Sequence, residues 1–185
     1  MTASAALQQR LREILLKRSV TRGKFVLASG RRSSVYIDAR RTTMSGEGLA
    51  LIGALGLERL AARGWTPRAV GGLTLGADPV AYAIAAAARA RGVALDAFTV
   101  RRAPKTHGTA KRIEGCFEPG DTVVVVEDVI TTGASAQEAI RAVEAAGGRV
   151  LGVLAVVDRE EGGRAALEAA GHPVETLVSA SELDL

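Results

Sequence analysis

The residue types best suited to chemistry lie in one short run, residues 123–136, which reads VVVVEDVITTGASA. Four consecutive valines predict a strand buried on both faces, as in the middle of a parallel sheet, and open α/β sheets bind ligands where such strands end. The small residues of 131–135 let backbone N–H groups close around a phosphate, and a helix starting near Ala134 adds the positive end of its dipole. Glu127 and Asp128 would repel a bare phosphate, so the ligand must also offer hydroxyl donors or a bound cation. A sugar phosphate meets both requirements.

This run resembles the signature of the type I phosphoribosyltransferases. In that family the acidic pair holds the ribose hydroxyls of 5-phosphoribosyl 1-diphosphate (PRPP), and the following loop holds its 5-phosphate. Two further segments narrow the resemblance to orotate phosphoribosyltransferase, because residues 101–108, RRAPKTHG, are similar to its mobile catalytic loop and residues 25–38 to its N-terminal segment. With residues 71–79 and Asp158-Arg159 included, the resemblance covers most of the chain. The alternative for the acidic run is a plain strand-to-helix turn, which has no use for two adjacent acids.

The resemblance implies a role for particular residues. The PRPP-binding set is Thr74, Leu75 and Gly76 for the pyrophosphate, with Glu127, Asp128, Val129, Ile130, Thr131, Thr132, Gly133, Ala134 and Ser135 for the ribose and its 5-phosphate. The catalytic set is Arg101, Arg102, Lys105, His107 and Asp128. Asp128 would balance positive charge at an oxocarbenium-like centre. Orotate would be bound by Thr131, Arg159 and the region of Tyr36, since the planar fork of arginine pairs well with a carboxylate.

Two of these roles have simpler alternatives. Residues 101–108 are basic enough to form a solvated surface loop, and only the resemblance makes them catalytic, with His107 as a general acid. Arg159 could instead be a surface arginine paired with Glu160 or Glu161.

The pyrophosphate loop and the N-terminal segment depart from some relatives. Residues 74–76 could form an ordinary turn, but Gly71, Gly72 and Gly76 leave room for a ligand to approach the backbone closely. Some relatives have a lysine in this loop, so its absence here implies contacts from the backbone and from Mg²⁺. Mg²⁺ is expected to be held mainly through PRPP, without a protein metal cage. Some relatives also have a lysine in place of Ala28, so the segment around it is expected to cover the base through backbone groups.

Composition favours one α/β domain with a small anionic substrate. A chain of 185 residues with 48% hydrophobic composition can bury a substantial core but is too short for two ordinary domains. The net charge of +4 comes from arginines spread along the chain, and aromatic residues are only 3%, which disfavours a nucleic-acid partner. There is no signal pattern, no run long enough to span a membrane, and a single cysteine, Cys116, so we expect a cytoplasmic protein.

Helical and strand patterns alternate after residue 46, which predicts a doubly wound, mainly parallel sheet flanked by helices, the type I phosphoribosyltransferase fold. The expected helices cover residues 3–17, 47–63, 78–91, 134–146 and 163–170, and the expected strands 69–73, 94–100, 122–126, 150–157 and 174–178. A break at 21–23 and a hairpin of 25–27 with 35–37 would form a small N-terminal hood. We therefore expect a single domain over 1–185, made of a helix and hood (1–45), an α/β core (46–185) and, within it, a mobile catalytic loop (101–119).

The implied activity is transfer of a phosphoribosyl group from PRPP to orotate, giving orotidine 5'-phosphate and diphosphate for UMP synthesis, in a homodimer whose catalytic loop is shared between subunits. A purine phosphoribosyltransferase is the first rival, which would keep the acidic run but would not need residues 101–108 or Arg159. A PRPP-sensing regulator that binds nucleic acid without catalysis is the second, although no residues are left over for a DNA-binding domain. A P-loop kinase is excluded, because G-x-x-x-x-G-K-[ST] does not occur.

Overall fold

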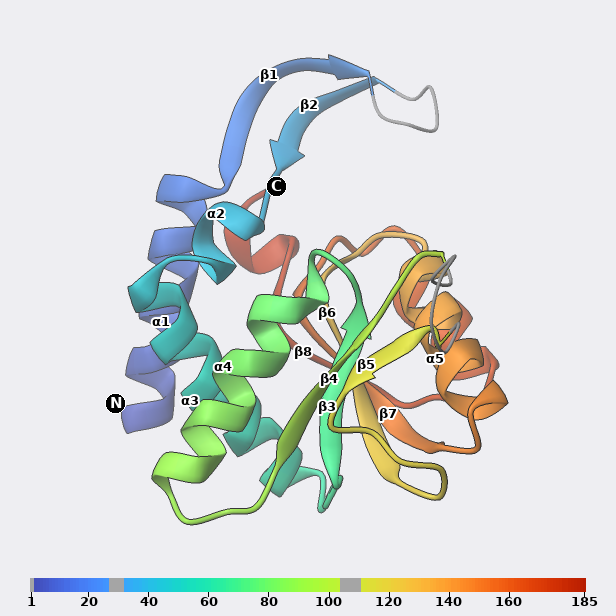
Figure 1. Cartoon of the computed structure of the whole chain (residues 1–185). Coiled ribbons are helices and arrows are strands. Elements are labelled where there is room, and N and C mark those ends of the chain that lie inside the picture. The colour runs from blue at the N-terminus through green and yellow to red at the C-terminus, as the bar shows by residue number, and fades with distance from the viewer. Residues whose placement is uncertain (1, 27–31, 104–110) are drawn as a thin grey trace.

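The computed structural model describes residues 2–26, 32–103 and 111–185. Within these residues a six-stranded sheet lies between two layers of helices, with the strand order β5-β4-β3-β6-β7-β8 (Figure 1). Neighbouring strands are parallel throughout, except that β5 runs antiparallel to β4. The predicted fold class, a doubly wound and mainly parallel sheet, is confirmed.

The strands of this sheet are β3 (Ala69–Leu73), β4 (Asp96–Val100), β5 (Ile113–Gly115), β6 (Thr122–Ile130), β7 (Arg149–Asp158) and β8 (Val174–Ser179). One face is covered by α1 (Ala3–Arg18), α3 (Gly46–Ala62) and α4 (Ala77–Ala90), and the other by α5 (Ala134–Ala145) and α6 (Gly163–Ala169). The chain also forms a short helix α2 (Arg40–Thr43) and a 3₁₀ turn η1 (Ser181–Leu183). No helix in the described part of the chain has the length and apolar character needed to cross a membrane.

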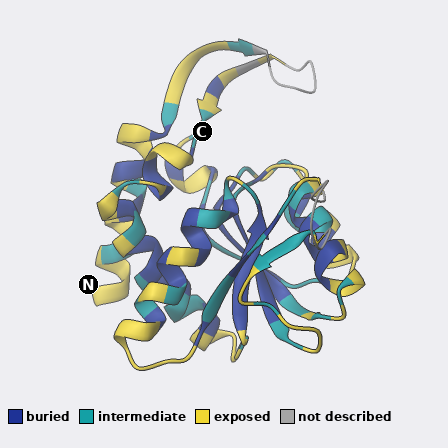
Figure 2. Cartoon of the chain, viewed as in Figure 1, coloured by how far each residue is buried: buried dark blue, intermediate teal, exposed yellow. Residues whose placement is uncertain are grey.

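The four valines of β6 explain why the sheet is covered on both sides. Val124 and Val126 pack into the core beneath α3 and α4, and Val123 and Val125 pack into the core beneath α5. All four are fully buried, and Figure 2 shows the central strands as the buried layer of the molecule. Successive side chains of a strand point to opposite faces of the sheet, so consecutive residues are all buried only where helices cover both faces.

The strand β6 is longer than predicted, and this changes the position of the acidic pair. Its expected end was residue 126, but pairing with β7 continues through Glu127 opposite Ala155 to Ile130 opposite Asp158. Glu127 and Asp128 therefore lie within the strand and do not follow it. Their side chains are held by the sheet itself, which gives them a firmer base than a loop would provide.

The expected loop over 101–119 contains a strand that sequence patterns did not indicate. Residues Ile113–Gly115 form β5 and pair with β4, with Gly115 opposite Phe98. Three residues are too few to show an alternating pattern. Residues 104–110 lie outside the described residues, and the predicted mobility of this loop stays a prediction.

The N-terminal segment forms an antiparallel hairpin of β1 (Val20–Val26) and β2 (Arg32–Ile37), which projects from the body in Figure 1. The predicted break at 21–23 was wrong, because these residues belong to β1, whose pairing is irregular between Arg22 and Phe25. The helix α1 ends at Arg18, before these residues, and the N–H of its C-cap, Ser19, donates to the Leu15 carbonyl over 2.8 Å. The Ser19 hydroxyl lies 2.7 Å from the buried Thr42 hydroxyl, which ties the base of the hairpin to α2.

Candidate active site

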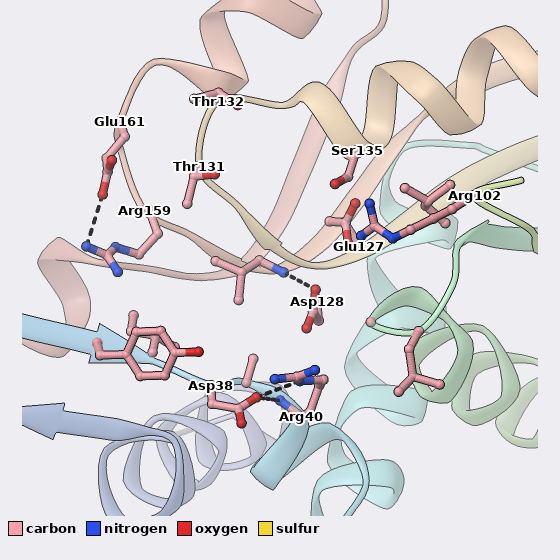
Figure 3. Close-up of a pocket in the computed structure, with 17 residues that line it drawn as sticks. Asp38, Arg40, Arg102, Glu127, Asp128, Thr131, Thr132, Ser135, Arg159 and Glu161 are labelled. Atoms are coloured by element: carbon pink, nitrogen blue, oxygen red, sulfur yellow. Dashed lines mark hydrogen bonds and ion pairs between the residues drawn. The ribbon is translucent and has the colours of Figure 1, made fainter. Parts of the chain in front are cut away.

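A cavity of about 630 Å³ opens at the carboxyl edge of the sheet. Strand ends from β3 and β6, the β6–α5 and β7–α6 connections and the end of β2 all contribute to its wall (Figure 3). Of the predicted site residues, the wall contains Tyr36, Leu75, Gly76, Arg102, Glu127, Asp128, Val129, Thr131, Thr132, Ser135 and Arg159. Residues more than a hundred positions apart in sequence are thus brought together in one cavity.

Five other predicted residues lie elsewhere. Ile130, Gly133 and Ala134 line a smaller hollow of about 50 Å³ in the β6–α5 connection, beside the main cavity. Thr74 and Arg101 line neither hollow. Lys105 and His107 fall outside the described residues.

The β6–α5 connection has the geometry of an anion-binding turn. Gly133 is the N-cap of α5 and has a φ of +79°, a left-handed conformation that glycine adopts without strain. The Gly163 N–H donates to the Thr131 carbonyl over 2.9 Å, which fixes the turn against α6. The first N–H groups of α5 have no partners within the helix, and residues 133–136 line the small hollow. The positive end of the helix dipole therefore lies at a hollow where an anion could bind.

Glu127 is the least solvated acid in the cavity wall. The residue is 6% exposed, and its Oε2 has no hydrogen-bond partner among the described residues. Burial, reinforced by the negative charge of Asp128, raises the pKa of Glu127 well above its usual value, while the positive charge of Arg102 opposes this rise. A buried acceptor without a partner is a binding position for a hydroxyl donor.

Replacing Glu127 with glutamine should stabilise the ligand-free protein. Because folding raises the pKa of Glu127, the folded protein binds the proton of this carboxyl more tightly than the unfolded chain does. The resulting contribution to folding stability is complete only below the unfolded pKa of about 4.3, and it is lost as the pH rises through the folded pKa. Thermal unfolding at pH 8 should therefore give a Tm roughly 2–6 °C higher for Glu127→Gln, an advantage that shrinks as the pH falls toward 5. PRPP should protect this variant against thermal unfolding less than it protects the wild type.

Glu144→Gln, on the exposed face of α5, is the matched control. A Glu127→Gln protein that is less stable than the wild type at pH 8 would contradict the argument.

Asp128 projects from the neighbouring position of β6 into the main cavity, facing Arg40 (Figure 3). Its Oδ1 accepts a hydrogen bond from the Val129 N–H over 2.9 Å. A Cβ added at Gly76 would lie 2.5 Å from the same oxygen. The β3–α4 turn is thus packed directly against Asp128, so groups bound by the turn and by the acid would belong to the same ligand.

The glycines before this turn serve the packing of the sheet. A Cβ at Gly71 would collide with the Phe98 carbonyl, and one at Gly72 with the Val126 carbonyl. The expectation that these two glycines give a ligand room was wrong, because neighbouring strands occupy that space. The turn itself is held by Asp78 of α4, whose carboxylate accepts hydrogen bonds from Thr74 Oγ1 and Thr99 Oγ1, each over 2.8 Å.

The two arginines that begin the basic segment differ in position. Arg102 lines the cavity, and Figure 3 shows it beside Glu127. Arg101 lies outside the wall, with its Nη1 3.9 Å from Glu114 Oε1. The Arg101 N–H donates to the Arg112 carbonyl over 2.8 Å, so the two ends of the segment are held together at the rim of the site.

Arg159 lies in the cavity wall and is paired with Glu161. Its Nη2 is 3.0 Å from Glu161 Oε1, and the two side chains are only 14% and 20% exposed. The pairing with Glu161 is the one that the simpler alternative expected, and the contact with orotate stays a prediction. The arginine has the acidic partner of the simpler alternative, but the pair belongs to the cavity and not to the open surface.

Three charged wall residues, Asp38, Arg40 and Glu161, were not among the predicted site residues, and Glu161 was considered only as a possible partner of Arg159. Asp38 Oδ1 accepts hydrogen bonds from Arg40 Nε over 2.8 Å and from the Arg40 N–H over 3.3 Å. The hydrogen bond from Arg40 lowers the pKa of Asp38, and the same bond, assisted by the charge of Asp38, raises that of Arg40. For Asp38 and Arg40 the only available signal was their place close to Tyr36 in the sequence, since α2, which begins at Arg40, is a single turn.

The described residues contain no group of three or more histidine, cysteine, aspartate or glutamate side chains arranged to hold a metal ion. The carboxylates of Glu127 and Asp128 do provide the hard oxygen atoms that Mg²⁺ takes together with phosphate oxygens. The donor set therefore fits a metal ion that arrives with a phosphorylated ligand.

Comparison with known proteins gives consistent matches. The family model of the phosphoribosyl transferase domain matches residues 47–169. The orotate phosphoribosyltransferase of Mycobacterium avium is 46% identical over 177 residues, covering 96% of each chain, and that of Aquifex aeolicus is 44% identical, covering 95% of this chain and 97% of its own. The crystal structure of orotate phosphoribosyltransferase from Mycobacterium tuberculosis in complex with Fe(III) dicitrate superposes with a TM-score of 0.86 at 44% identity, over 97% of this chain and 99% of that one. A complex of the same enzyme with PRPP gives a TM-score of 0.78 at 39% identity, over 96% and 92%.

Proposed function

This chain belongs to the phosphoribosyltransferase family, and we propose that its cavity transfers the phosphoribosyl group of PRPP to orotate, giving orotidine 5'-phosphate and diphosphate. The predicted activity is confirmed at the level of the enzyme class, since relatives with 44–46% identity over nearly the whole chain are orotate phosphoribosyltransferases. The observation that carries the assignment of the site is the buried, unpartnered Oε2 of Glu127 beside a small-residue turn. That pairing of features suits a ligand with both hydroxyl groups and a phosphate.

The ribose and its 5-phosphate are assigned to β6 and the turn after it. Glu127 and Asp128 would accept hydrogen bonds from the ribose hydroxyls, and the N–H groups of residues 131–135 would hold the phosphate. The small hollow is adjacent to Glu127, which supports a ligand that spans both. Asp128 would then lie beside the sugar, where its negative charge stabilises the positive charge that develops as the bond to pyrophosphate breaks.

The pyrophosphate is assigned to residues 74–76 and to the basic segment. The packing of Gly76 against Asp128 supports this, because it sets the β3–α4 turn next to the sugar position. Arg102 at the cavity wall would add positive charge for the departing diphosphate. Arg101, Lys105 and His107 of the partner subunit's segment would join it when that segment closes. Mg²⁺, when bound with PRPP, neutralises part of the phosphate charge.

Orotate is assigned to Arg159, Thr131 and Tyr36. All three line the cavity, and Arg159 is the only one of them with a positive charge for the orotate carboxylate. The hairpin of residues 20–37 would cover the base, and Tyr36 stacks against Phe25 with ring centroids 5.6 Å apart. In this proposal residues 1–45 and 46–185 act as one domain in a cytoplasmic protein.

The substrate assignment is tested by diphosphate release from PRPP and Mg²⁺ with two acceptor bases. The purified chain should release diphosphate with orotate, with a matching change in ultraviolet absorbance, and should be inactive with adenine. Turnover of adenine but not of orotate would favour the purine rival. Binding of PRPP and retention on RNA without any turnover would favour a regulator.

We also propose a homodimer in which part of the segment over 101–119 reaches into the partner's site and completes it, and mixing two inactive variants tests this. Asp128→Asn removes the acid of one site, and Lys105→Ala alters the segment. In a mixed population half of the dimers are hybrids, and with a shared segment one of the two sites in each hybrid is intact, so about a quarter of wild-type activity should return. A segment that serves its own subunit would leave a lesion in every site, and activity would not return.

A further inference from the structure

We infer that Glu161 is a positioning residue, which holds the guanidinium of Arg159 ready to receive the carboxylate of the substrate. This inference rests on the proposed function, because it takes Arg159 as the partner of orotate. Figure 3 shows Glu161 and Arg159 together on one wall, across the cavity from Asp38 and Arg40. Glu161 binds the Nη2 of Arg159 at 3.0 Å. A guanidinium has five N–H donors, so donors remain for a second carboxylate.

Hydrogen bonds of other residues fix the backbone around Arg159. The Arg159 N–H donates to the Ile130 carbonyl over 2.9 Å, which joins the turn to the end of β6. Asp158, which is 3% exposed, accepts from the Glu160 N–H over 2.8 Å and from Arg164 Nε over 3.1 Å. Removing the Glu161 carboxylate should therefore release the Arg159 side chain and leave the turn in place.

The preceding residue is chemically the same but has a different partner. The Glu160 carboxylate accepts hydrogen bonds from the Ser181 N–H over 2.8 Å and from the Ser181 hydroxyl over 3.0 Å. Glu160 is exposed and does not line the cavity. Two adjacent glutamates thus provide a matched pair, in which only Glu161 is connected to the cavity.

Two opposing effects of Glu161 must be compared. Glu161 orders the long side chain of Arg159 before orotate binds, so less rotamer freedom of Arg159 is lost on binding. It also carries the same charge as the orotate carboxylate and repels it. The guanidinium would lie between the two carboxylates, so their separation is about twice the distance from either one to the guanidinium, and the repulsion is about half of each attraction. The attraction and the ordering should therefore dominate.

Steady-state kinetics of Glu161 variants test this inference. Glu161→Ala should raise the KM for orotate about tenfold, the loss of roughly one charge-assisted hydrogen bond, while kcat and the KM for PRPP change less than about twofold. Glu161→Gln keeps an oxygen that accepts the same bond, so its KM for orotate should stay within about threefold of the wild type. Glu160→Gln should leave the KM for orotate unchanged. In an Arg159→Ala background, Glu161→Ala should add nothing.

Several results would overturn the inference. The KM for orotate could stay the same or fall in Glu161→Ala, or kcat and both KM values could change together, as expected for damage to the turn. Glu161→Gln could also be as impaired as Glu161→Ala, which would mean that charge and not position matters. If Arg159→Ala raises the KM for orotate but Glu161→Ala does not, this inference fails alone. If Arg159→Ala leaves that KM unchanged, the proposed role of Arg159 fails, and this inference with it.

Discussion

Replacing Asp128 with asparagine should lower kcat by about two to three orders of magnitude. The amide has nearly the same size and can still accept the hydrogen bond from the Val129 N–H, so the fold and the cavity should be preserved. What is lost is the negative charge beside the sugar, where positive charge develops in the transition state. The measurement is kcat at saturating orotate, PRPP and Mg²⁺, with PRPP binding measured separately.

Asp184→Asn provides a control for the same chemical change at an exposed position next to the C-terminus. It should retain full activity. An unchanged kcat in Asp128→Asn would remove Asp128 from the mechanism. A loss of PRPP binding as large as the loss in kcat would instead make Asp128 a residue that binds the ground state and the transition state equally.

Replacing Arg159 with alanine should raise the KM for orotate by about 30- to 100-fold, because it removes a charge-assisted pairing to a carboxylate in a partly buried wall. The KM for PRPP should change little, since Arg159 is assigned to the base and not to the ribose or the phosphates. Uracil, which lacks the carboxylate, should be discriminated from orotate much less well by this variant than by the wild type.

Arg141→Ala, on the exposed face of α5, is the control for removing an arginine. Its kinetic constants should match those of the wild type. An equal rise in the KM for orotate and for PRPP in Arg159→Ala would contradict the assignment, because a residue that contacts only the base cannot weaken both substrates alike.

Much of the fold could be predicted because its signals are local. Each central strand is a short apolar run between two helical patterns, and β3 covers the same residues that were expected, Ala69–Leu73. The acidic pair and the turn after it form a continuous stretch of sequence, so the predicted sugar and phosphate residues could be identified together. The resemblance added the catalytic segment and Arg159, which periodicity alone does not indicate.

The features that were missed depend on contacts between distant residues. Arg40 faces Asp128 only because a single helical turn, α2, sets it above the sheet edge. The extension of β6 past residue 126 depends on its pairing with β7. Gly71 and Gly72 were interpreted as giving a ligand room because the carbonyls that need their space belong to neighbouring strands. Such contacts leave no pattern in a single sequence.

The most direct test of the central claim is a crystal structure of the protein with ribose 5-phosphate bound. The proposed site predicts the phosphate against the N–H groups of residues 131–135, and the ribose hydroxyls within hydrogen-bonding distance of Glu127 and Asp128. Ribose 5-phosphate bound elsewhere, with this cavity empty, would contradict the claim.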